Sequence, residues 1–302
     1  MKTIEIYAPA KINLSLDITG IRDDGYHLLR SVMQSISLAD KLRITIADGP
    51  AAIRLTADRP EIPLDSKNTC YRAAEFWLEK CGNSYNIMID IEKHIPSEAG
   101  LGGGSADAAA VLNGLNSLAG NPLTRAELLE AAARTGADVP FCLNGGTALC
   151  EGIGELITPL KPMPDRHLLL LKPDFGLSTP AVFRESDSIA QTARVDHQQI
   201  LAAINSGSWR DLGIVSVNVL EAAALRIRPE LAVYLDAMES TDAEMVMMTG
   251  SGTCIYAVFE NEMLRDKAAE GVSRSLHSDD QLLFASIIEA CQYSESGFVP
   301  KS

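Results

Sequence analysis

Basic residues are scarce in this chain of 302 residues, which has 26 lysines and arginines against 40 aspartates and glutamates and a formal net charge of −14. Nonspecific binding to nucleic acids or anionic membranes needs a basic surface, so both functions are disfavoured. No apolar run approaches the roughly 18 residues that a membrane span needs, and we see no secretory signal. An anionic ligand must therefore be held by local dipoles and a few cations.

The six cysteines lack every pattern of a metal or disulfide site, since no C-x-x-C pair and no histidine at metal-binding spacing accompanies them. Most lie in apolar strand or helix patterns, which is typical of buried thiols in a reducing cytoplasm. We therefore expect a cytoplasmic protein whose thiols are buried. The cysteines are Cys70, Cys81, Cys142, Cys150, Cys254 and Cys291.

Glycine is concentrated in one segment, residues 95–107, which reads IPSEAGLGGGSAD. Without a Cβ in the way, backbone N–H groups can converge in such a turn, and a helix behind it points its positive end at the same place. This arrangement predicts a phosphate site. A flexible linker is the alternative, but an apolar strand pattern precedes the loop and an alanine-rich helix pattern follows it.

Two well-known phosphate loops do not match this segment. A P-loop needs lysine and then serine or threonine after its last glycine, whereas Gly104 is followed by Ser105 and Ala106. The dinucleotide-binding pattern needs glycine at its sixth position, which is Ser105 when counted from Gly100. Neither a P-loop NTPase nor a Rossmann enzyme is indicated.

The rest of the chain alternates strand and helix patterns, which predicts an α+β fold. Two prolines in LKPMPD, residues 160–165, suggest a boundary between domains 1–161 and 162–302. Thr124 and Glu127 have the spacing of a capping box at a helix start, and the polar end at 293–302 is expected to fray. Before 160, strands are expected at 3–8, 11–20, 33–38, 41–47, 52–57, 85–93, 146–151 and 154–159, with a helix at about 68–82.

Three further segments are open to two interpretations each. Lys11 and Asn13 share the polar face of an alternating strand, and alone Lys11 would be a solvated residue on that face. Asp138 in GADVPF could simply cap a helix. The segment TGSGT at 249–253 could be only a hairpin turn.

Taken together, the four segments resemble one family. PAKINLSLDITGIRDDGYH, IPSEAGLGGGSADAA, GADVPF and MTGSGT occur in the order of the motifs of the GHMP small-molecule kinases, over residues 8 to about 258. The resemblance implies a two-domain fold, with an N-terminal domain like domain 2 of ribosomal protein S5, a ferredoxin-like C-terminal domain and the site between them. Thr249 departs slightly from the pattern, where a smaller residue such as serine is expected.

Within the superfamily, KINLSLDITGIRDDGYH, GADVPF and ALCEGIGE are similar to kinases of the non-mevalonate isoprenoid pathway. This implies transfer of the ATP γ-phosphate to the 2-hydroxyl of a cytidine-diphosphate-linked methylerythritol, with Mg²⁺ accompanying ATP. Asn68 would contact adenine and Ser105 could link to Mg²⁺, whose other ligands the sequence does not identify. The segment that would wrap the ATP phosphates is Pro96, Ser97, Glu98, Ala99, Gly100, Leu101, Gly102, Gly103, Gly104, Ser105 and Ala106.

The resemblance also assigns the chemistry. Asp138 would accept the proton of the acceptor hydroxyl, Lys11 would hold Asp138 ionised and offset charge on the phosphoryl group, and Asn13 would position the acceptor. Phosphoryl transfer through a loose transition state asks mainly for alignment and charge neutralisation, which suits this division. Cytosine would be held by three residues: Tyr26 and Phe183 on its two faces, and His27 at its edge.

Three alternatives remain open. Another GHMP kinase, acting on a mevalonate derivative, homoserine or a sugar, would have no use for an aromatic cytosine clamp. A non-catalytic sensor of ATP or a metabolite could lose Lys11 or Asp138, but both are present. A translation-associated module, suggested by the S5-like half, is opposed by the net charge of −14. For His27, the alternative of a residue that only stabilises a turn is open as well.

Overall fold

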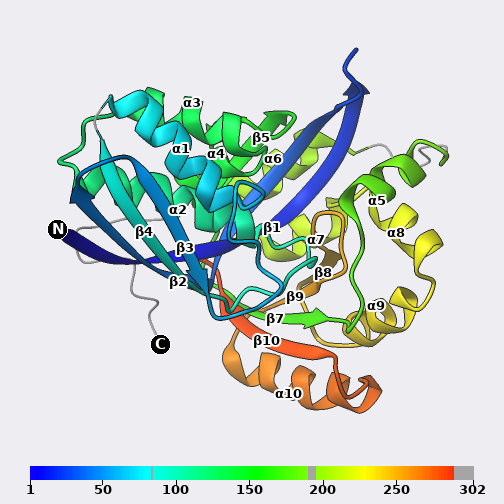
Figure 1. The fold of residues 1–302 in the computed structure, drawn as a ribbon. Helices are drawn as coiled ribbons and strands as arrows, with labels where there is room; N and C mark the ends of the chain where they lie inside the picture. The colour runs from blue at the N-terminus through cyan, green and yellow to red at the C-terminus, as the bar shows by residue number, and fades with distance from the viewer. Residues whose placement is uncertain (83, 190–194, 289–302) are drawn as a thin grey trace.

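The computed structural model describes residues 1–82, 84–189 and 195–288. Cys291 and the end at 293–302, predicted to fray, lie outside these residues. The predicted α+β class is confirmed: a mixed sheet of six strands and an antiparallel sheet of four are each covered by helices (Figure 1).

The first sheet is built around two very long neighbouring strands, β1 and β2, which pair antiparallel along their length. β2 is also paired with β4 through its second half and with β5 through its first half, and β3 and β6 lie at the edges. The strands are β1 (Lys2–Ile21), β2 (His27–Asp48), β3 (Ala52–Ala57), β4 (Tyr85–Glu92), β5 (Thr147–Gly152) and β6 (Leu156–Pro159).

The expected break between strands 3–8 and 11–20 is wrong, as is the break between 33–38 and 41–47. The register shifts between Pro9 and Lys11 instead. An irregularity of this kind bends a strand without ending it, so residues that look like a turn stay within the sheet. The remaining strand predictions of the N-terminal half agree with the structure to within a few residues.

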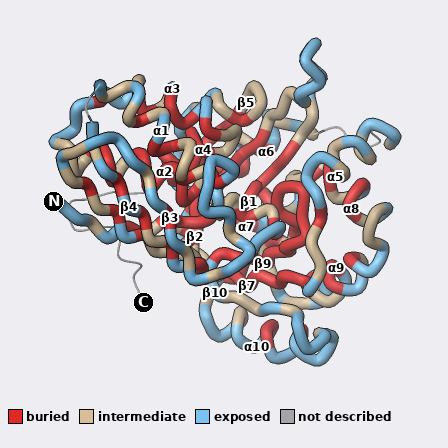
Figure 2. Tube along the Cα trace, viewed as in Figure 1, coloured by how far each residue is buried: buried red, intermediate tan, exposed pale blue. Residues whose placement is uncertain are grey.

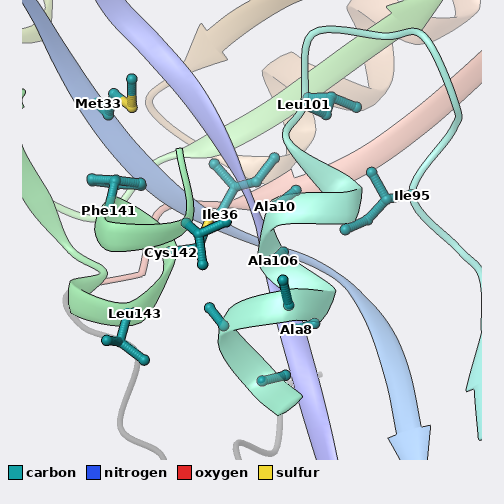
Figure 3. Close-up of a cluster of buried hydrophobic side chains, with 14 of the residues drawn as sticks. Ala8, Ala10, Met33, Ile36, Ile95, Leu101, Ala106, Phe141, Cys142 and Leu143 are labelled. Atoms are coloured by element: carbon teal, nitrogen blue, oxygen red, sulfur yellow. The ribbon is translucent and has the colours of Figure 1, made fainter. Parts of the chain in front are cut away.

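Four helices cover one face of this sheet (Figure 1): α1 (Thr69–Cys81), α2 (Gly103–Leu118), α3 (Arg125–Thr135) and α4 (Val139–Asn144). α2 lies on β1 and β2. Gly114 allows that close approach, since the Ile44 side chain lies 2.6 Å from where a Cβ would be. The predicted capping box of Thr124 and Glu127 is present. Beside the start of α2, side chains from β1, β2, α4 and the glycine-rich segment form one buried cluster (Figure 3).

The second sheet has the order β10-β7-β9-β8 with antiparallel neighbours. Together with a helical crossover after β7 and another after β9, this is the ferredoxin-like arrangement. Its strands are β7 (His167–Lys172), β8 (Met245–Met248), β9 (Ile255–Phe259) and β10 (Gln281–Ser286). Its helices are α5 (Thr179–Ser186), α6 (His197–Ser206), α7 (Trp209–Val215), α8 (Glu221–Ile227), α9 (Leu231–Glu239) and α10 (Glu262–Val272), followed by the short 3₁₀ helix η1 (Ser273–Ser275).

The two halves are joined through shared backbone and shared core. Leu16 on β1 exchanges backbone hydrogen bonds with Val217 and Val219, and the larger buried cluster continues from the first sheet to Met163 and Trp209. Buried chain therefore runs through the middle of the molecule (Figure 2). The boundary at 161/162 remains a prediction.

Two composition-based expectations can be compared with the fold. Four of the five described cysteines are buried, as predicted: Cys70, Cys142, Cys150 and Cys254. Among residues 1–82, 84–189 and 195–288, no helix has the length and apolarity needed to cross a membrane.

Candidate active site

A cavity of about 900 Å³ lies where the two halves meet. It is lined by residues of all four sequence motifs. The first motif contributes residues of both KINL and DDGYH, and the others contribute residues of the glycine-rich segment, of GADV and of TGSG. We call it the central cavity. Of the residues predicted to wrap phosphates, those from Pro96 to Ser105 line it, whereas Ala106 is buried behind it (Figure 3).

The glycine-rich segment 96–106, here called the phosphate loop, is ordered by contacts on both sides. Leu101 and Ala99 are buried, and their backbone oxygens accept hydrogen bonds from the amides of Lys11 (3.0 Å) and Cys254 (3.2 Å). The linker interpretation is therefore wrong. Gly102 is the N-cap of α2 in a left-handed conformation and has no side chain to cap the helix, so the first turn of α2 presents its amides at the cavity.

Glycine is required at position 100 for a specific reason. Gly100 has a φ of +73°, and a Cβ there would lie 2.1 Å from the backbone oxygen of Thr249. The phosphate loop and the segment 249–253 therefore touch through their backbones. A side chain at position 100 would push the two segments apart.

Lys11 and Asp138 come together in the central cavity. The Lys11 ammonium lies 3.7 Å from Asp138 Oδ2, and their side chains are 5% and 29% exposed. The same ammonium donates a 2.6 Å hydrogen bond to Asn13 Oδ1. The solvated interpretation of Lys11 is wrong, because the second half of the molecule covers the polar face of β1.

Asp138 occupies the N-cap position of α4, but its side chain caps no backbone amide. The cap interpretation is therefore right about position and wrong about the side chain, which is directed at Lys11 instead. Cys150 lies near this pair. Its burial, assisted by the negative charge of Asp138, raises the pKa of its thiol, so Cys150 stays protonated and is a poor nucleophile.

The segment 249–253 is both a turn and part of the site. It joins β8 to β9, with Gly252 N donating to Thr249 O (3.0 Å), and Gly250 and Ser251 line the cavity. The Thr249 hydroxyl accepts from Asn13 N (3.1 Å) and lies 3.3 Å from both Asn13 Oδ1 and Gly100 O. The departure from serine thus leaves a hydroxyl that connects β1 to the phosphate loop.

The three predicted cytosine-binding residues, Tyr26, His27 and Phe183, all line the cavity. Residues 22–27, here called the acceptor hairpin, comprise the turn 22–26 between β1 and β2 and the first residue of β2. They include Tyr26, which is 61% exposed, and His27. The rings of His27 and Phe183 are 4.9 Å apart, and His27 Nε2 hydrogen-bonds Asp187 Oδ1 at 2.7 Å. His27 therefore packs against α5 rather than only supporting the turn.

The two asparagines line the cavity but also bond within the protein. Asn68 is the N-cap of α1, where its Oδ1 accepts from Cys70 N (2.8 Å) and its Nδ2 donates to Pro63 O (2.7 Å). Asn13 Nδ2 donates to Ser31 Oγ (2.8 Å). Each asparagine thus has a structural role, and their contacts with ligands remain predictions.

Sequence reasoning missed a buried ionic group beneath the phosphate loop. The Lys93 ammonium pairs with Asp40 and, at 2.7 Å, with Asp107 Oδ2. Burial and the nearby Asp40 raise the pKa of Asp107 to about 8, although Lys93 opposes this. Burial lowers the pKa of Lys93, but the two carboxylates raise it more. The sequence offers one signal for this ionic group, namely that Lys93 and Asp107 lie on either side of the glycines.

No preformed metal centre is found within the described ranges, since no three His, Cys, Asp or Glu side chains there are grouped to hold an ion. Mg²⁺ usually takes only one or two protein ligands and its remaining ligands from phosphates and water. The oxygen donors that line the cavity, the Ser105 hydroxyl and the Asp138 carboxylate among them, fit a metal that arrives with a nucleotide.

Comparison with known proteins gives the class. Family models described as "GHMP kinases N terminal domain" and "GHMP kinases C terminal" match residues 68–146 and 196–278. Among solved structures, homoserine kinase from Cytophaga hutchinsonii is similar with a TM-score of 0.75 over 96% of each chain, and at 20% identity this likeness concerns the fold alone. The fold is that of a GHMP kinase, a class of enzyme that uses ATP to phosphorylate a small molecule.

Nearer relatives narrow the class. The 4-diphosphocytidyl-2-C-methyl-D-erythritol kinase of Caldicellulosiruptor saccharolyticus is 43% identical over 87% of this chain and 90% of its own, and that of Carboxydothermus hydrogenoformans is 44% identical over 85% and 88%. A crystal structure of 4-(cytidine 5'-diphospho)-2C-methyl-D-erythritol kinase has a TM-score of 0.76 and 32% identity, covering 94% of this chain and 99% of that one. The chain belongs to this family of kinases.

Proposed function

We propose that the protein transfers the γ-phosphate of ATP to the 2-hydroxyl of 4-diphosphocytidyl-2-C-methyl-D-erythritol, a step of the non-mevalonate route to isoprenoid precursors. The observation that carries the proposal is the central cavity itself. It places a helix-capping glycine loop, a paired lysine and aspartate, and an aromatic end in one continuous space.

The phosphate loop supplies the donor end. Its backbone amides, supported by the N-terminus of α2, attract the phosphate oxygens of ATP, and Asn68 at the start of α1 faces the adenine. Ser105 would hold the Mg²⁺ that accompanies ATP, and the metal would neutralise charge on the phosphates. A loose transition state gains most from such fixed positive potential.

Lys11 and Asp138 act at the point of transfer. The Asp138 carboxylate accepts the proton of the acceptor hydroxyl as the hydroxyl oxygen bonds to the γ-phosphorus and the bond from that phosphorus to the departing ADP breaks. The Lys11 ammonium, held by Asn13 Oδ1 at 2.6 Å, faces both the carboxylate and the phosphoryl group in transit, so it offsets negative charge on each. Asn13 positions the acceptor, and its hydrogen bond with Lys11 also keeps the ammonium in place.

The aromatic end binds the acceptor. Tyr26 and Phe183 stack on the two faces of cytosine, and His27, fixed by its hydrogen bond to Asp187, contacts the base edge. A mevalonate derivative or homoserine offers no flat base to such a pair. The clamp thus favours the cytidyl acceptor over the acceptors of other GHMP kinases.

An acceptor panel tests the proposal. We expect the purified protein with ATP and Mg²⁺ to phosphorylate the cytidyl compound far faster than mevalonate, homoserine or a sugar, as measured by ADP release and product mass. Asp138→Asn should lower kcat by about 10²-fold and leave the binding of both substrates intact. Comparable rates with mevalonate or homoserine would refute the assignment, and near-normal turnover of Asp138→Asn would remove that residue from the mechanism.

A further inference from the structure

Four basic side chains line the central cavity, and two of them have carboxylate partners. Lys11 pairs with Asp138, and Lys93 pairs with Asp40 and Asp107. In the described part of the chain, the side chains of the other two, Lys67 and Arg184, form no ion pair and no hydrogen bond within the protein. Lys67 precedes Asn68, which is predicted to contact adenine, whereas Arg184 follows Phe183, which is predicted to stack on cytosine.

The carboxylates nearest to Arg184 in the sequence are committed elsewhere. Glu185 pairs with Arg226 at 3.4 Å, and Asp187 pairs with His27 at 2.7 Å. α5 therefore presents an arginine to the cavity without an internal counter-ion, in a chain with 14 more acidic than basic residues. A guanidinium has a fork of donors that matches phosphate oxygens and keeps its charge at any relevant pH.

We propose that Arg184 binds the diphosphate of the acceptor, an inference that rests on the proposed function. Phe183 and Arg184 both line the central cavity, and the long Arg184 side chain is exposed. If the base stacks on Phe183, the diphosphate on the 5' side of its ribose therefore comes within reach of Arg184. Lys11 is poorly suited to this role, because its ammonium is held by Asn13 and Asp138. Arg184 thus makes the protein bind a nucleoside diphosphate more tightly than an uncharged nucleoside, whereas Tyr26 and Phe183 recognise the base.

Binding of cytidine and of CDP to the full chain separates these contributions. By isothermal titration calorimetry, we expect the wild-type protein to bind CDP about tenfold or more tighter than cytidine, since a charge-assisted contact contributes that much. Arg184→Ala should lose most of this preference through weaker CDP binding, with cytidine affinity unchanged. Arg184→Lys should keep part of it, because lysine supplies the charge without the fork.

Controls exclude a general effect of charge or folding. Arg274→Ala removes an exposed arginine of η1 outside the cavity and should leave the CDP-to-cytidine ratio at the wild-type value. Binding of a non-hydrolysable ATP analogue and the melting temperature should be unchanged in Arg184→Ala. An equal loss of affinity for the ATP analogue would overturn the assignment to the acceptor.

Other outcomes are also decisive. A wild-type CDP-to-cytidine ratio in Arg184→Ala would overturn the inference, and so would a parallel loss of affinity for both ligands, because Arg184 would then support the base clamp. If the wild-type protein binds neither cytidine nor CDP and phosphorylates a different acceptor, the proposed function itself fails. If instead the protein binds both ligands and substitution of Arg184 changes neither affinity, only the inference about Arg184 fails.

Discussion

The phosphate loop and the acceptor hairpin line the same cavity but are built by opposite means. The phosphate loop is fixed by main-chain contacts: its carbonyl oxygens receive hydrogen bonds from Lys11 N, Cys254 N and the Thr69 hydroxyl. The acceptor hairpin exposes Tyr26 and reaches α5 through the side chain of His27. The difference predicts that the function of the loop depends on its backbone shape, whereas that of the hairpin depends on the identity of its side chains.

The largest effect is expected at Lys11, which lines the same cavity and donates its backbone N–H to Leu101 O of the phosphate loop. Lys11→Met should lower kcat by roughly 10² to 10³-fold, because fixed positive charge stabilises the transferring phosphoryl group. Steady-state kinetics with both substrates measure this. Lys41→Met, whose partner Glu5 lies 3.2 Å away and outside the cavity, is the control. A change in KM alone would mean that Lys11 only binds.

Gly100→Ala tests the importance of shape in the loop. The new Cβ would lie 2.1 Å from Thr249 O, so the phosphate loop must move away from the segment 249–253. The cost of this movement adds to the strain of a positive φ, roughly 1 to 2 kcal/mol. We therefore expect ATP affinity to fall about tenfold or more. Gly120→Ala has the same strain at φ +83° and no neighbour within 4 Å. Calorimetric titration and melting curves compare the two variants. Equal behaviour would show that the close approach does not matter.

Tyr26→Ala tests the importance of the side chain in the hairpin. Base stacking contributes about 1 to 3 kcal/mol, so the KM for the cytidyl substrate should rise about tenfold while the KM for ATP stays unchanged. Because Tyr26 is exposed, the melting temperature should change little. Tyr26→Phe, which retains the ring, should behave almost as wild type. A fall in stability with parallel loss for both substrates would instead make Tyr26 a core residue.

The smallest effect on catalysis is expected beneath the loop, where the prediction concerns stability. Because the folded-state pKa of Asp107 is raised from 3.8 to about 8, folding disfavours its ionised form. This cost is absent below about pH 4, grows through neutral pH and is complete above about pH 8. Asp107→Asn removes it, so the melting temperature of the variant relative to wild type should be higher at pH 9 than at pH 5. An unchanged difference would contradict the raised pKa.

Local signals predicted the phosphate loop well, because its requirements are local. Gly102 caps α2 because glycine adopts a left-handed conformation readily, and the flanking Ile95 and Leu101 are buried as their apolar character suggests. The capping box at Thr124 and the burial of four cysteines follow from equally short patterns. The limits of α1 were also readable, from Asn68 to Gly82.

The rest depends on contacts that no short window contains. The alternation of polar and apolar residues in β1 suggested that one face of the strand is exposed to solvent. Instead, the segment 249–253, more than 230 residues away in the sequence, covers Asn13. Asp40 and Lys93 are 53 residues apart and become partners only when β2 and β4 pair. A one-residue irregularity near Pro9 likewise keeps β1 continuous. Strand pairing, rather than residue preference, decides these features.

The Thr249 hydroxyl has a consequence for how the protein is made. It contacts Asn13 on β1 and Gly100 of the phosphate loop, so residues near the two ends of the chain complete each other. A ribosome that has synthesised the first 161 residues has made Lys11, the phosphate loop and Asp138. The segment 249–253, which holds β1 and the loop together, has not yet been synthesised. Catalytic competence therefore arises late in synthesis, and fragments released early by the ribosome or by proteolysis would carry the motifs without the activity.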